Sequence, residues 1–587
     1  MEGTMVDLRK KPYRLNTQQI EWVHHTLENM SLEEKIGQLF IMLKTEPGVN
    51  EARIKKTLDK YHQGGLRWQG GDKEDVYLQN ATYQKASNIP LLIAANCDDG
   101  GNGCLPKEGT FVATAAQAAA NASDETAYHM GLVSAREATS IGCNWLFNPV
   151  ADIYMNWRNT IVNTRCFGDN PEAVIKNTKA FIKGVKDVNP NMACCIKHFP
   201  GDGVEELDQH LVLGVNDLSV DEWKSTYGKV YNELIDEGVE SIMVGHISLP
   251  EMSKKLRPGI KDEEIMPATL APELLTDLLR EELGYNGLVL TDATHMIGLS
   301  AMKKREEAIP LAIAAGCDMI LFANDIEEDI EFVKNGIEKN ILSIERLNEA
   351  VTRILGLKAK LELTNPSIAI PSPDLINTTV NTKEHQSFRK LAADRCTTLV
   401  KDTAGLIPVN PTEKKNVLLV YVQSAPTSIK YVPDSSRQIM LEELEQAGFD
   451  VTLAPSFYDL EAENGPTPMN MVKMLGKGTR KEFREKYDLV IVAINVKGYA
   501  QENNVRIKWS LHHSQEMPWY VSEVPTIGIS LNYTNHLIDI PQVKTFINAF
   551  GSTRDNIKAA VEKMCGKSDF TGEVKEHYFC GRRETRL

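Results

Sequence analysis

The sequence lacks any apolar run that approaches the ~20 residues needed to cross a membrane. Its first seven residues (MEGTMVD) contain no apolar core of the kind that a signal peptide requires. Among 587 residues, 65 are Lys or Arg and 80 are Asp or Glu, which gives a formal charge of −15. No basic excess is present to bind phosphate groups. We therefore expect a cytoplasmic protein with no nucleic-acid partner and no membrane partner.

Metal-binding and disulfide patterns are also missing. The ten cysteines include no C-x-x-C pair, and several lie inside apolar runs. This usage is typical of buried free thiols in a reducing compartment, rather than of a disulfide framework or a zinc site. The histidines show neither H-x-H nor H-E-x-x-H spacing, which disfavours a divalent-metal hydrolase. We expect no bound metal.

Three common catalytic signatures are absent as well. The chain has no P-loop, no dinucleotide fingerprint after a strand, and no serine in a nucleophile elbow. The glycine-rich run at 100–103 (GGNG) lacks the spacing that opens a helix, so we interpret it as a turn. These absences predict an enzyme without a nucleotide cofactor, or indeed any cofactor.

The length favours two or three domains, and the first 363 residues show a regular alternation. Apolar β-type runs are separated by amphipathic helical stretches such as 171–186 and 272–282. Eight such strand–helix units predict a (β/α)8 TIM barrel, and a doubly wound sheet, which usually has fewer strands, is the alternative. The predicted strands are 39–43, 65–68, 91–95, 145–150, 192–196, 241–244, 288–290 and 319–322.

A second α/β domain is predicted after a Pro- and Ser-rich stretch at 364–373 (TNPSIAIPSP). We place the linker at 364–385 and the domain at 386–587. Four apolar runs there, with helices between them, predict a three-layer α/β/α sandwich with parallel strands. Those runs are 417–422, 451–453, 489–494 and 526–531.

Ionisable residues recur where the predicted barrel strands end. A TIM barrel carries its active site at the carboxyl ends of its strands, so we expect these side chains to meet there. For Asp152 and His246 a supporting, hydrogen-bonded role is at least as plausible as ligand contact. The residues are Asp98 and Asp99 after the third strand, Asp152 after the fourth, Lys197 and His198 after the fifth, His246 after the sixth, and Asp292 after the seventh.

Carboxylates with Lys, Arg and His at one barrel end suit a polyhydroxylated ligand, because charged groups form strong hydrogen bonds with hydroxyls. Two of the ionisable groups could act as nucleophile and general acid. The alternative for the fifth strand is a buried, hydrogen-bonded histidine beside a solvated loop.

The motifs resemble glycoside hydrolase family 3, and in particular its two-domain β-N-acetylglucosaminidase branch. The central match is residues 197–201 (KHFPG), with Asp208 and His210 downstream. Supporting matches occur in order along the chain: 148–152 (NPVAD), 163–168 (NTRCFG), 267–270 (PATL) and 278–292 (LLREELGYNGLVLTD).

The resemblance implies specific roles at the matching positions. Asp292 would be the nucleophile that forms a covalent glycosyl-enzyme, His210 the acid/base, and Asp208 the carboxylate that orients His210. The residues expected to contact the sugar are Asp98, Arg165, Lys197, His198 and His246. The second domain would then support or shape the site, or form a homodimer.

Three positions depart from the family pattern. Asp202 stands where the signature usually has His between two glycines. The acidic motif after the third strand, residues 96–101 (NCDDGG), matches approximately, which leaves the choice between Asp98 and Asp99 open. Thr294 and His295 follow the predicted nucleophile where small or acidic residues are common.

We therefore predict a retaining exo-β-N-acetylglucosaminidase (β-N-acetylhexosaminidase) that acts on an oligosaccharide or glycoside substrate. One alternative is a β-glucosidase or a β-N-acetylglucosaminide phosphorylase of the same family. An imidazole base, unlike a carboxylate, would not repel phosphate. A sugar-binding protein without turnover is the second alternative.

Overall fold

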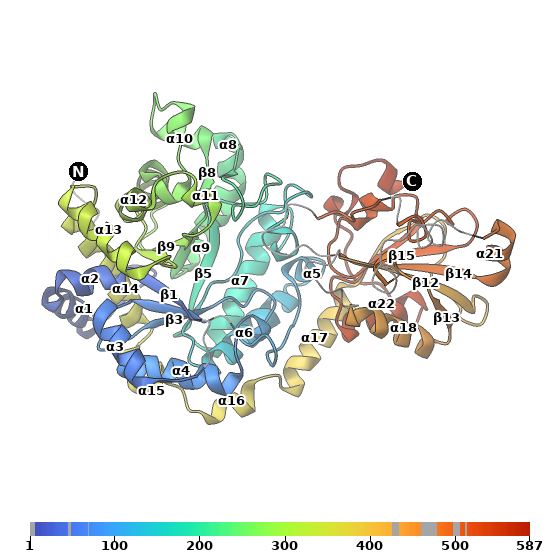
Figure 1. The fold of residues 1–587 in the computed structure, drawn as a ribbon, viewed down its shortest axis with the longest axis horizontal. Coiled ribbons are helices and arrows are strands. Elements are labelled where there is room, and N and C mark those ends of the chain that lie inside the picture. The colour runs from blue at the N-terminus through green and yellow to red at the C-terminus, as the bar shows by residue number, and fades with distance from the viewer. Residues whose placement is uncertain are drawn as a thin grey trace. The chain divides into compact units, whose positions relative to one another are not determined.

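The computed structural model describes residues 6–44, 48–68, 70–424, 434–459, 478–496, 505–510 and 513–587 (Figure 1). The chain divides into two compact units. The first comprises Met1–Val112 and Ala127–Gln386, and the second comprises Ala113–Thr126 and Ser387–Leu587.

The first unit is the predicted TIM barrel. Eight parallel strands close in the order β1-β10-β9-β7-β5-β4-β3-β2, so each strand of the cycle pairs with two neighbours. The strands are buried apolar segments, as expected where helices cover the outside of the sheet. Their bounds are β1 (Phe40–Lys44), β2 (Gly65–Trp68), β3 (Leu92–Ala95), β4 (Trp145–Leu146), β5 (Ala193–Phe199), β7 (Ser241–Val244), β9 (Leu288–Ala293) and β10 (Met319–Leu321).

Several helices of this unit begin at a side-chain cap, and α7 is an example. The Asn170 side chain accepts the backbone N–H of Ala173, and Pro171 occupies the first turn of α7, where a missing N–H costs nothing. The main helices are α1 (Thr17–Asn29), α2 (Leu32–Gln38), α3 (Glu51–Tyr61), α4 (Lys73–Ala86), α6 (Glu125–Ser140), α7 (Pro171–Val188), α9 (Lys229–Glu237), α10 (Pro250–Leu256), η6 (Glu273–Glu282), α12 (Arg305–Ala315), α13 (Ile326–Glu338) and α14 (Ile344–Lys360). The predicted linker region contains α15 (Pro366–Ala369) and α16 (Asp374–Thr379), and α17 (Lys383–Cys396) begins there.

Three barrel strands differ from their predicted lengths by two residues or more, and one of them, β9, continues past Leu290 to Ala293. β4 ends at Leu146, because Asn148 turns its side chain to accept the N–H of Cys97 at 2.6 Å and Pro149 has no N–H to offer. β5 instead continues through Lys197 and His198 to Phe199, which pairs with Val244. Sequence reasoning ended this strand at its first charged residue, whereas the structure buries both charged side chains.

The second unit is an α/β domain around a six-stranded sheet. Its order is β11-β16-β15-β14-β12-β13, and alternate residues of β12 and β14 enter two separate apolar clusters, which means that both faces of the sheet are covered. β11 runs antiparallel to β16, and the sequence predicted neither of these two strands. The elements are β11 (Thr398–Asp402), β12 (Asn416–Gln423), α18 (Ser435–Ala447), β13 (Asp450–Leu453), α21 (Arg480–Lys486), β14 (Leu489–Asn495), β15 (Thr526–Ser530), β16 (Thr545–Asn548) and α22 (Arg554–Met564).

A segment that precedes most of the barrel strands belongs to this second unit. Ala113–Thr126, which includes α5 (Ala115–Ala119), lies between β3 and α6 in the sequence. The Ala120 carbonyl accepts the N–H of Glu573 at 2.8 Å, and Thr126 Oγ1 lies 3.8 Å from Cys396 Sγ. The second unit is therefore assembled from two separate stretches of chain.

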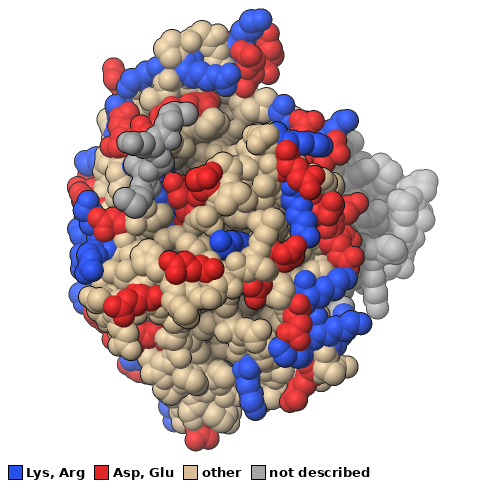
Figure 2. Space-filling view, turned by 90° about the vertical axis from the view of Figure 1, so that its left-hand side faces the viewer, with Lys and Arg blue, Asp and Glu red and all other residues tan. Residues whose placement is uncertain are grey.

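Charged side chains of both signs lie on the surface, and the cysteines lie mostly in the interior. Figure 2 shows acidic and basic side chains interspersed over one face of the molecule. All ten cysteines are free thiols, and all but Cys565 are buried. Within the described ranges, none of the helices is both long and apolar enough to cross a membrane. In the same residues, no group of three or more His, Cys, Asp or Glu side chains could hold a metal ion.

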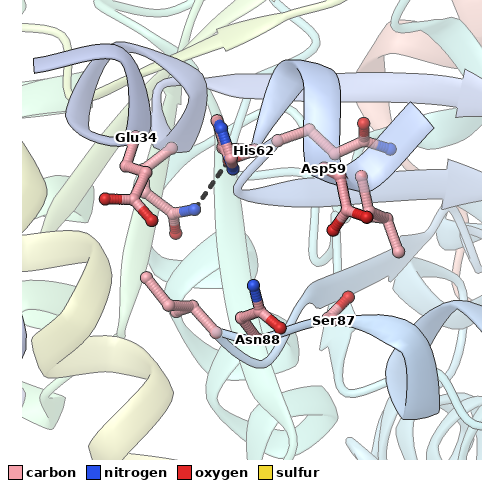
Figure 3. A pocket seen from close by; sticks show the side chains of 9 residues that line it. Glu34, Asp59, His62, Ser87 and Asn88 are labelled. Carbon is pink, nitrogen blue, oxygen red and sulfur yellow. Dashed lines mark hydrogen bonds between the residues drawn. The ribbon is translucent and has the colours of Figure 1, made fainter. Parts of the chain in front are cut away.

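A pocket opens at the amino ends of the first strands of the barrel (Figure 3). Its empty space, part of which is open to solvent, is about 350 Å³, and Gln38 at its wall donates to the His62 carbonyl at 2.7 Å. None of the residues that line it is a predicted site residue. They are Glu34, Gln38, Leu58, Asp59, His62, Gln63, Ser87, Asn88 and Ile89.

One buried carboxylate organises the amino end of β9 and β10. Asp318 accepts Arg280 Nη2 at 2.8 Å and Arg346 Nη2 at 2.7 Å, with Arg353 Nη1 at 3.4 Å. It also accepts the N–H of Val289 at 2.9 Å. Burial would raise the pKa of Asp318, but the three guanidinium groups outweigh burial and hold it below its ordinary value.

Asp318→Asn should destabilise the barrel by about 3–5 kcal/mol, because it leaves three buried cations without their shared counter-charge. The measurement is the free energy of unfolding in denaturant. Loss of activity identifies the transition that belongs to the barrel. Asp262→Asn is the control, since Asp262 is 82% exposed and pairs with Lys254 in a surface contact. The role of Asp318 as shared counter-charge would be contradicted if the free energy of unfolding changed by more than about 1 kcal/mol in the control. It would also be contradicted if Asp318→Asn left that free energy unchanged.

Candidate active site

The predicted site residues meet at the carboxyl end of the barrel. Lys197 and His198 lie within β5, at its carboxyl end, and Asp292 lies near the end of β9. Asp98 follows β3, and His210 lies on the loop that follows β5. The Lys197–His198 peptide bond is cis. The strands of the closed sheet thus bring together residues that are far apart in the sequence.

Asp98 is the centre of one cluster of charges. Its Oδ2 accepts Arg165 Nε at 2.8 Å, and its Oδ1 lies 3.6 Å from Lys197 Nζ and accepts the Asn148 side-chain amide. Burial would raise the pKa of Asp98, but Lys197 and Arg165 outweigh it and hold the pKa well below its ordinary range. The structure therefore places Asp98, rather than Asp99, against Lys197 and Arg165.

Lys197 is 2% exposed, so its ammonium group is buried in the site. Burial lowers its pKa, and the charges of Asp98 and Asp292 oppose that shift. The ammonium group carries three N–H donors and lies 3.6 Å from Asp98 Oδ1.

His198 links Asp152 to Asp292. Asp152 is fully buried, and its carboxylate lies 2.7 Å from His198 Nδ1 and accepts the backbone N–H of His198 at 3.0 Å. His198 Nε2 then lies 3.9 Å from Asp292 Oδ2. The carboxylate of Asp152 fixes the ring so that its other nitrogen faces Asp292.

Asp292 is held in its ionised form. Burial would raise its pKa, but His198, His246 and His210 outweigh burial, and so the pKa lies below the ordinary value of 3.8. Its Oδ1 accepts the N–H of Ala293 at 2.7 Å. An ionised carboxylate with one oxygen fixed by the backbone has the character of a nucleophile.

Asp208 and His210 form a dyad on the loop after β5. Asp208 Oδ1 accepts the backbone N–H of His210 at 2.8 Å and lies 2.7 Å from His210 Nδ1. Burial would lower the pKa of His210, but the bond to Asp208 and the charge of Asp292 raise it above 6.5. The loop ends in β6 (Gly214–Val215), which pairs with β8 (Ile247–Ser248) after β7. The dyad is thereby attached to the barrel at both ends of its loop.

This arrangement can be compared with known proteins. Residues 31–357 match the model of the glycosyl hydrolase family 3 N terminal domain. The chain belongs to family 3. A curated relative from Cellulomonas fimi, a "Beta-N-acetylglucosaminidase/beta-glucosidase", is 36% identical over 585 residues, which cover 99% of this chain and 100% of that protein. A "Beta-hexosaminidase A" from Pseudoalteromonas piscicida is 28% identical over 400 residues, 66% of this chain and 64% of that protein.

Solved structures show the same two-part fold. The "Beta-glucoside phosphorylase BglX" is 35% identical with a TM-score of 0.89, and the match covers 100% of both chains. A "glycoside hydrolase family 3 beta-N-acetylglucosaminidase" from Paenibacillus sp. str. FPU-7 is 22% identical with a TM-score of 0.76, over 93% of this chain and 98% of that one. Family 3 membership makes the chain a glycosidase.

Two further histidines near Asp292 have different surroundings. His246, predicted to contact the sugar, is fully buried. Its Nδ1 lies 2.9 Å from Thr269 Oγ1 and its Nε2 lies 3.1 Å from the Ala293 carbonyl. With both ring nitrogens occupied, it can support the chain beside Asp292 but has no nitrogen for a sugar. His295, by contrast, is exposed and stacks on Phe322, with ring centroids 6.4 Å apart.

Two residues that the sequence analysis did not select also belong to this site. Arg67, in β2, interacts electrostatically with Asp98 and Asp292 and lies over the Phe322 ring at 5.8 Å. Asn148 donates to Asp98 and accepts the N–H of Cys97. A charged residue inside the short apolar run 65–68 was the available signal for Arg67. For Asn148, the signal was its place in the NPVAD motif.

Proposed function

We propose that the chain is a retaining exo-β-glycosidase that releases terminal β-linked N-acetylglucosamine or glucose. The observation that carries the proposal is the placement of an ionised Asp292, backed by His198, in the same family 3 barrel end as the Asp208–His210 dyad. A nucleophile and a separate acid/base are the two groups that retaining glycoside hydrolysis requires.

In the first step Asp292 attacks the anomeric carbon, and a covalent glycosyl ester forms. His210, whose pKa is raised above 6.5, donates its Nε2 proton to the departing oxygen while Asp208 stabilises the imidazolium. Asp98, Lys197 and Arg165, which lie together, offer hydrogen bonds to the sugar hydroxyls.

The second step needs His210 as a base, and the charges supply a reason for the change of role. The negative charge of Asp292 contributes to the raised pKa of His210. That charge disappears when Asp292 becomes an ester, so the pKa of His210 falls and the neutral imidazole is favoured. The neutral ring can then accept a proton from the attacking water, which restores both residues.

The sugar assignment is supported by the relatives. The Cellulomonas fimi protein, which is similar over the full length, carries both activities in its name, and the Pseudoalteromonas piscicida relative is named a β-hexosaminidase. A sugar-binding protein without turnover would not need the paired acid/base or an ionised Asp292.

Phosphorolysis is the second candidate, and a specific observation favours it. The similar solved structure with a TM-score of 0.89 is named a β-glucoside phosphorylase. Where the acid/base is His rather than a carboxylate, the neutral form carries no negative charge to repel phosphate. Phosphate would attack the same glycosyl ester and release the sugar 1-phosphate.

Asp292→Ala should reduce kcat/KM by several powers of ten, because Asp292 is the one carboxylate of β9 and no other residue of that strand can form the ester. Activity is measured with nitrophenyl β-glucoside and nitrophenyl β-N-acetylglucosaminide. Asp217→Ala, which removes an exposed carboxylate, is the control. A thermal melt checks that both variants fold. Retained activity in the first variant would refute the nucleophile assignment.

His210→Ala should lower kcat/KM strongly for alkyl glycosides and little for dinitrophenyl glycosides. The dinitrophenolate group departs without protonation, whereas an alkoxide needs a proton from the acid. In the native enzyme, kcat/KM for alkyl glycosides should fall as pH rises through the pKa of His210, above 6.5, because the acid form is lost. The variant should lack this alkaline limb. Equal losses on both substrates would show that His210 is not the acid.

Phosphate separates the two candidate acceptors. Hydrolysis predicts the free sugar as product at a rate that phosphate leaves unchanged. Phosphorolysis predicts a faster release of nitrophenol with rising phosphate and a sugar 1-phosphate among the products. The panel should include substrates with and without the 2-acetamido group, so that one experiment reports both the sugar and the acceptor.

A further inference from the structure

Asp202 lies near the start of the loop that carries the dyad, three residues after β5, and is buried at 5% exposure. Its Oδ1 accepts Asn159 Nδ2 at 2.9 Å and the N–H of Gly203 at 2.6 Å. Its own N–H donates to Asp152 Oδ1 at 2.8 Å, the carboxylate that also holds His198. Asp202 is therefore connected through one residue to the ring that faces Asp292.

The remaining oxygen of Asp202 faces the dyad. Gln209, which lies between Asp208 and His210 in the sequence, donates its Nε2 to Asp202 Oδ2 at 3.4 Å. Gln209 Oε1 accepts the N–H of His246 at 2.6 Å, and the Gln209 carbonyl accepts the N–H of Gly298 at 3.1 Å. Gln209 is 1% exposed, so solvent has little access to its amide and cannot readily replace these partners.

We propose that Asp202 is a positioning residue, which acts through Gln209 to fix the dyad loop relative to Asp292. This inference rests on the acid/base role proposed for His210. Neither Asp202 nor Gln209 touches the reacting atoms. Together they connect the loop that carries the acid to the strand ends that carry the nucleophile.

The side chain at position 202 faces hydrogen-bond donors, so it has to supply hydrogen-bond acceptors. The two oxygens of an ionised carboxylate receive three N–H donors here, from Asn159, Gly203 and Gln209. A neutral imidazole, as in the signature that this chain resembles, has one acceptor nitrogen and could not receive all three. Asp202 and Gln209 therefore form a matched pair specific to a chain with Asp at this place.

The charges around Asp202 agree with this role. Burial and the charge of Asp152 raise the pKa of Asp202 to about 6, and His198 and the bond from Asn159 oppose the increase. At neutral pH the side chain is thus mostly the carboxylate. Glu205 also lies within electrostatic reach of Asp202.

Asp202→Asn tests the pair with almost no change in shape. In either orientation the new amide directs N–H groups at a donor, so the loop loses a fixed position. We expect kcat/KM to fall about 10–100-fold for alkyl glycosides and less than about 3-fold for dinitrophenyl glycosides. Gln209→Met, which removes the donor without adding charge, should give the same selective loss.

The double variant Asp202→Asn/Gln209→Glu reverses the pair. The amide introduced at position 202 can donate to one oxygen of the carboxylate introduced at position 209, while the other oxygen still accepts the N–H of His246. Net charge is unchanged from the native enzyme. We expect the double variant to recover most of the kcat/KM on alkyl glycosides, whereas Gln209→Glu alone should be the least active of the set, because two carboxylates then face each other.

The outcomes separate this inference from the function on which it rests. If His210→Ala discriminates between the leaving groups but the Asp202 and Gln209 variants do not, or the double variant fails to recover, the positioning role is wrong. If His210→Ala itself shows no discrimination, the proposed acid/base role fails first. Thermal melts of all variants identify any loss that comes from unfolding.

Discussion

The site depends on the pairing of buried charges at the end of β5. Lys197 and His198 lie inside the barrel beside Asp98 and Asp152, which supply a counter-charge to Lys197 and a hydrogen-bond acceptor to His198. These contacts accompany the extension of the strand beyond its apolar run and turn His198 toward Asp292, whose pKa His198 lowers. Removing Asp98 would leave the buried Lys197 without this counter-charge, so the fold and the site share one set of contacts.

The Asp208–His210 dyad lies on a loop, whereas Lys197 and His198 lie in a strand. Side-chain hydrogen bonds hold this loop against the barrel. A loop residue that moves a proton has to hold its distance from a rigid nucleophile through both steps. In this chain the tie is made of the matched acceptor and donor of Asp202 and Gln209, with the short β6–β8 ladder at the far end of the loop. The negative charge of Asp292 raises the pKa of His210. In the proposed mechanism, conversion of Asp292 to an ester removes that charge and so lowers the pKa of His210.

Much of this could be predicted from the sequence. Eight apolar runs separated by helical stretches were enough for the barrel. The ionisable residues that follow five of those runs were enough for the grouping of Asp98, Lys197, His198 and Asp292, because parallel strands share one carboxyl end. The link from Gln209 to Asp202, the burial of His246 and the approach of Arg67 could not be predicted, because each depends on which side chains face one another across strands. β11 was not predicted because it follows α17 directly, outside the alternation of parallel strands and crossover helices that marks the other strands. The place of Ala113–Thr126 in the second unit was not predicted because local patterns do not reveal distant packing.

The path of the chain between the two units has a consequence for biosynthesis. Ala113–Thr126 emerges from the ribosome well before its partners Cys396 and Glu573, and before five of the eight barrel strands. The second unit therefore cannot complete its core from residues 387–587 alone, and Ala113–Thr126 does not meet its partner Glu573 until synthesis is nearly finished. Gene fragments cut at 364–385 would separate pieces of a single folding unit, so exchange of the C-terminal domain between relatives demands the segment 113–126 as well.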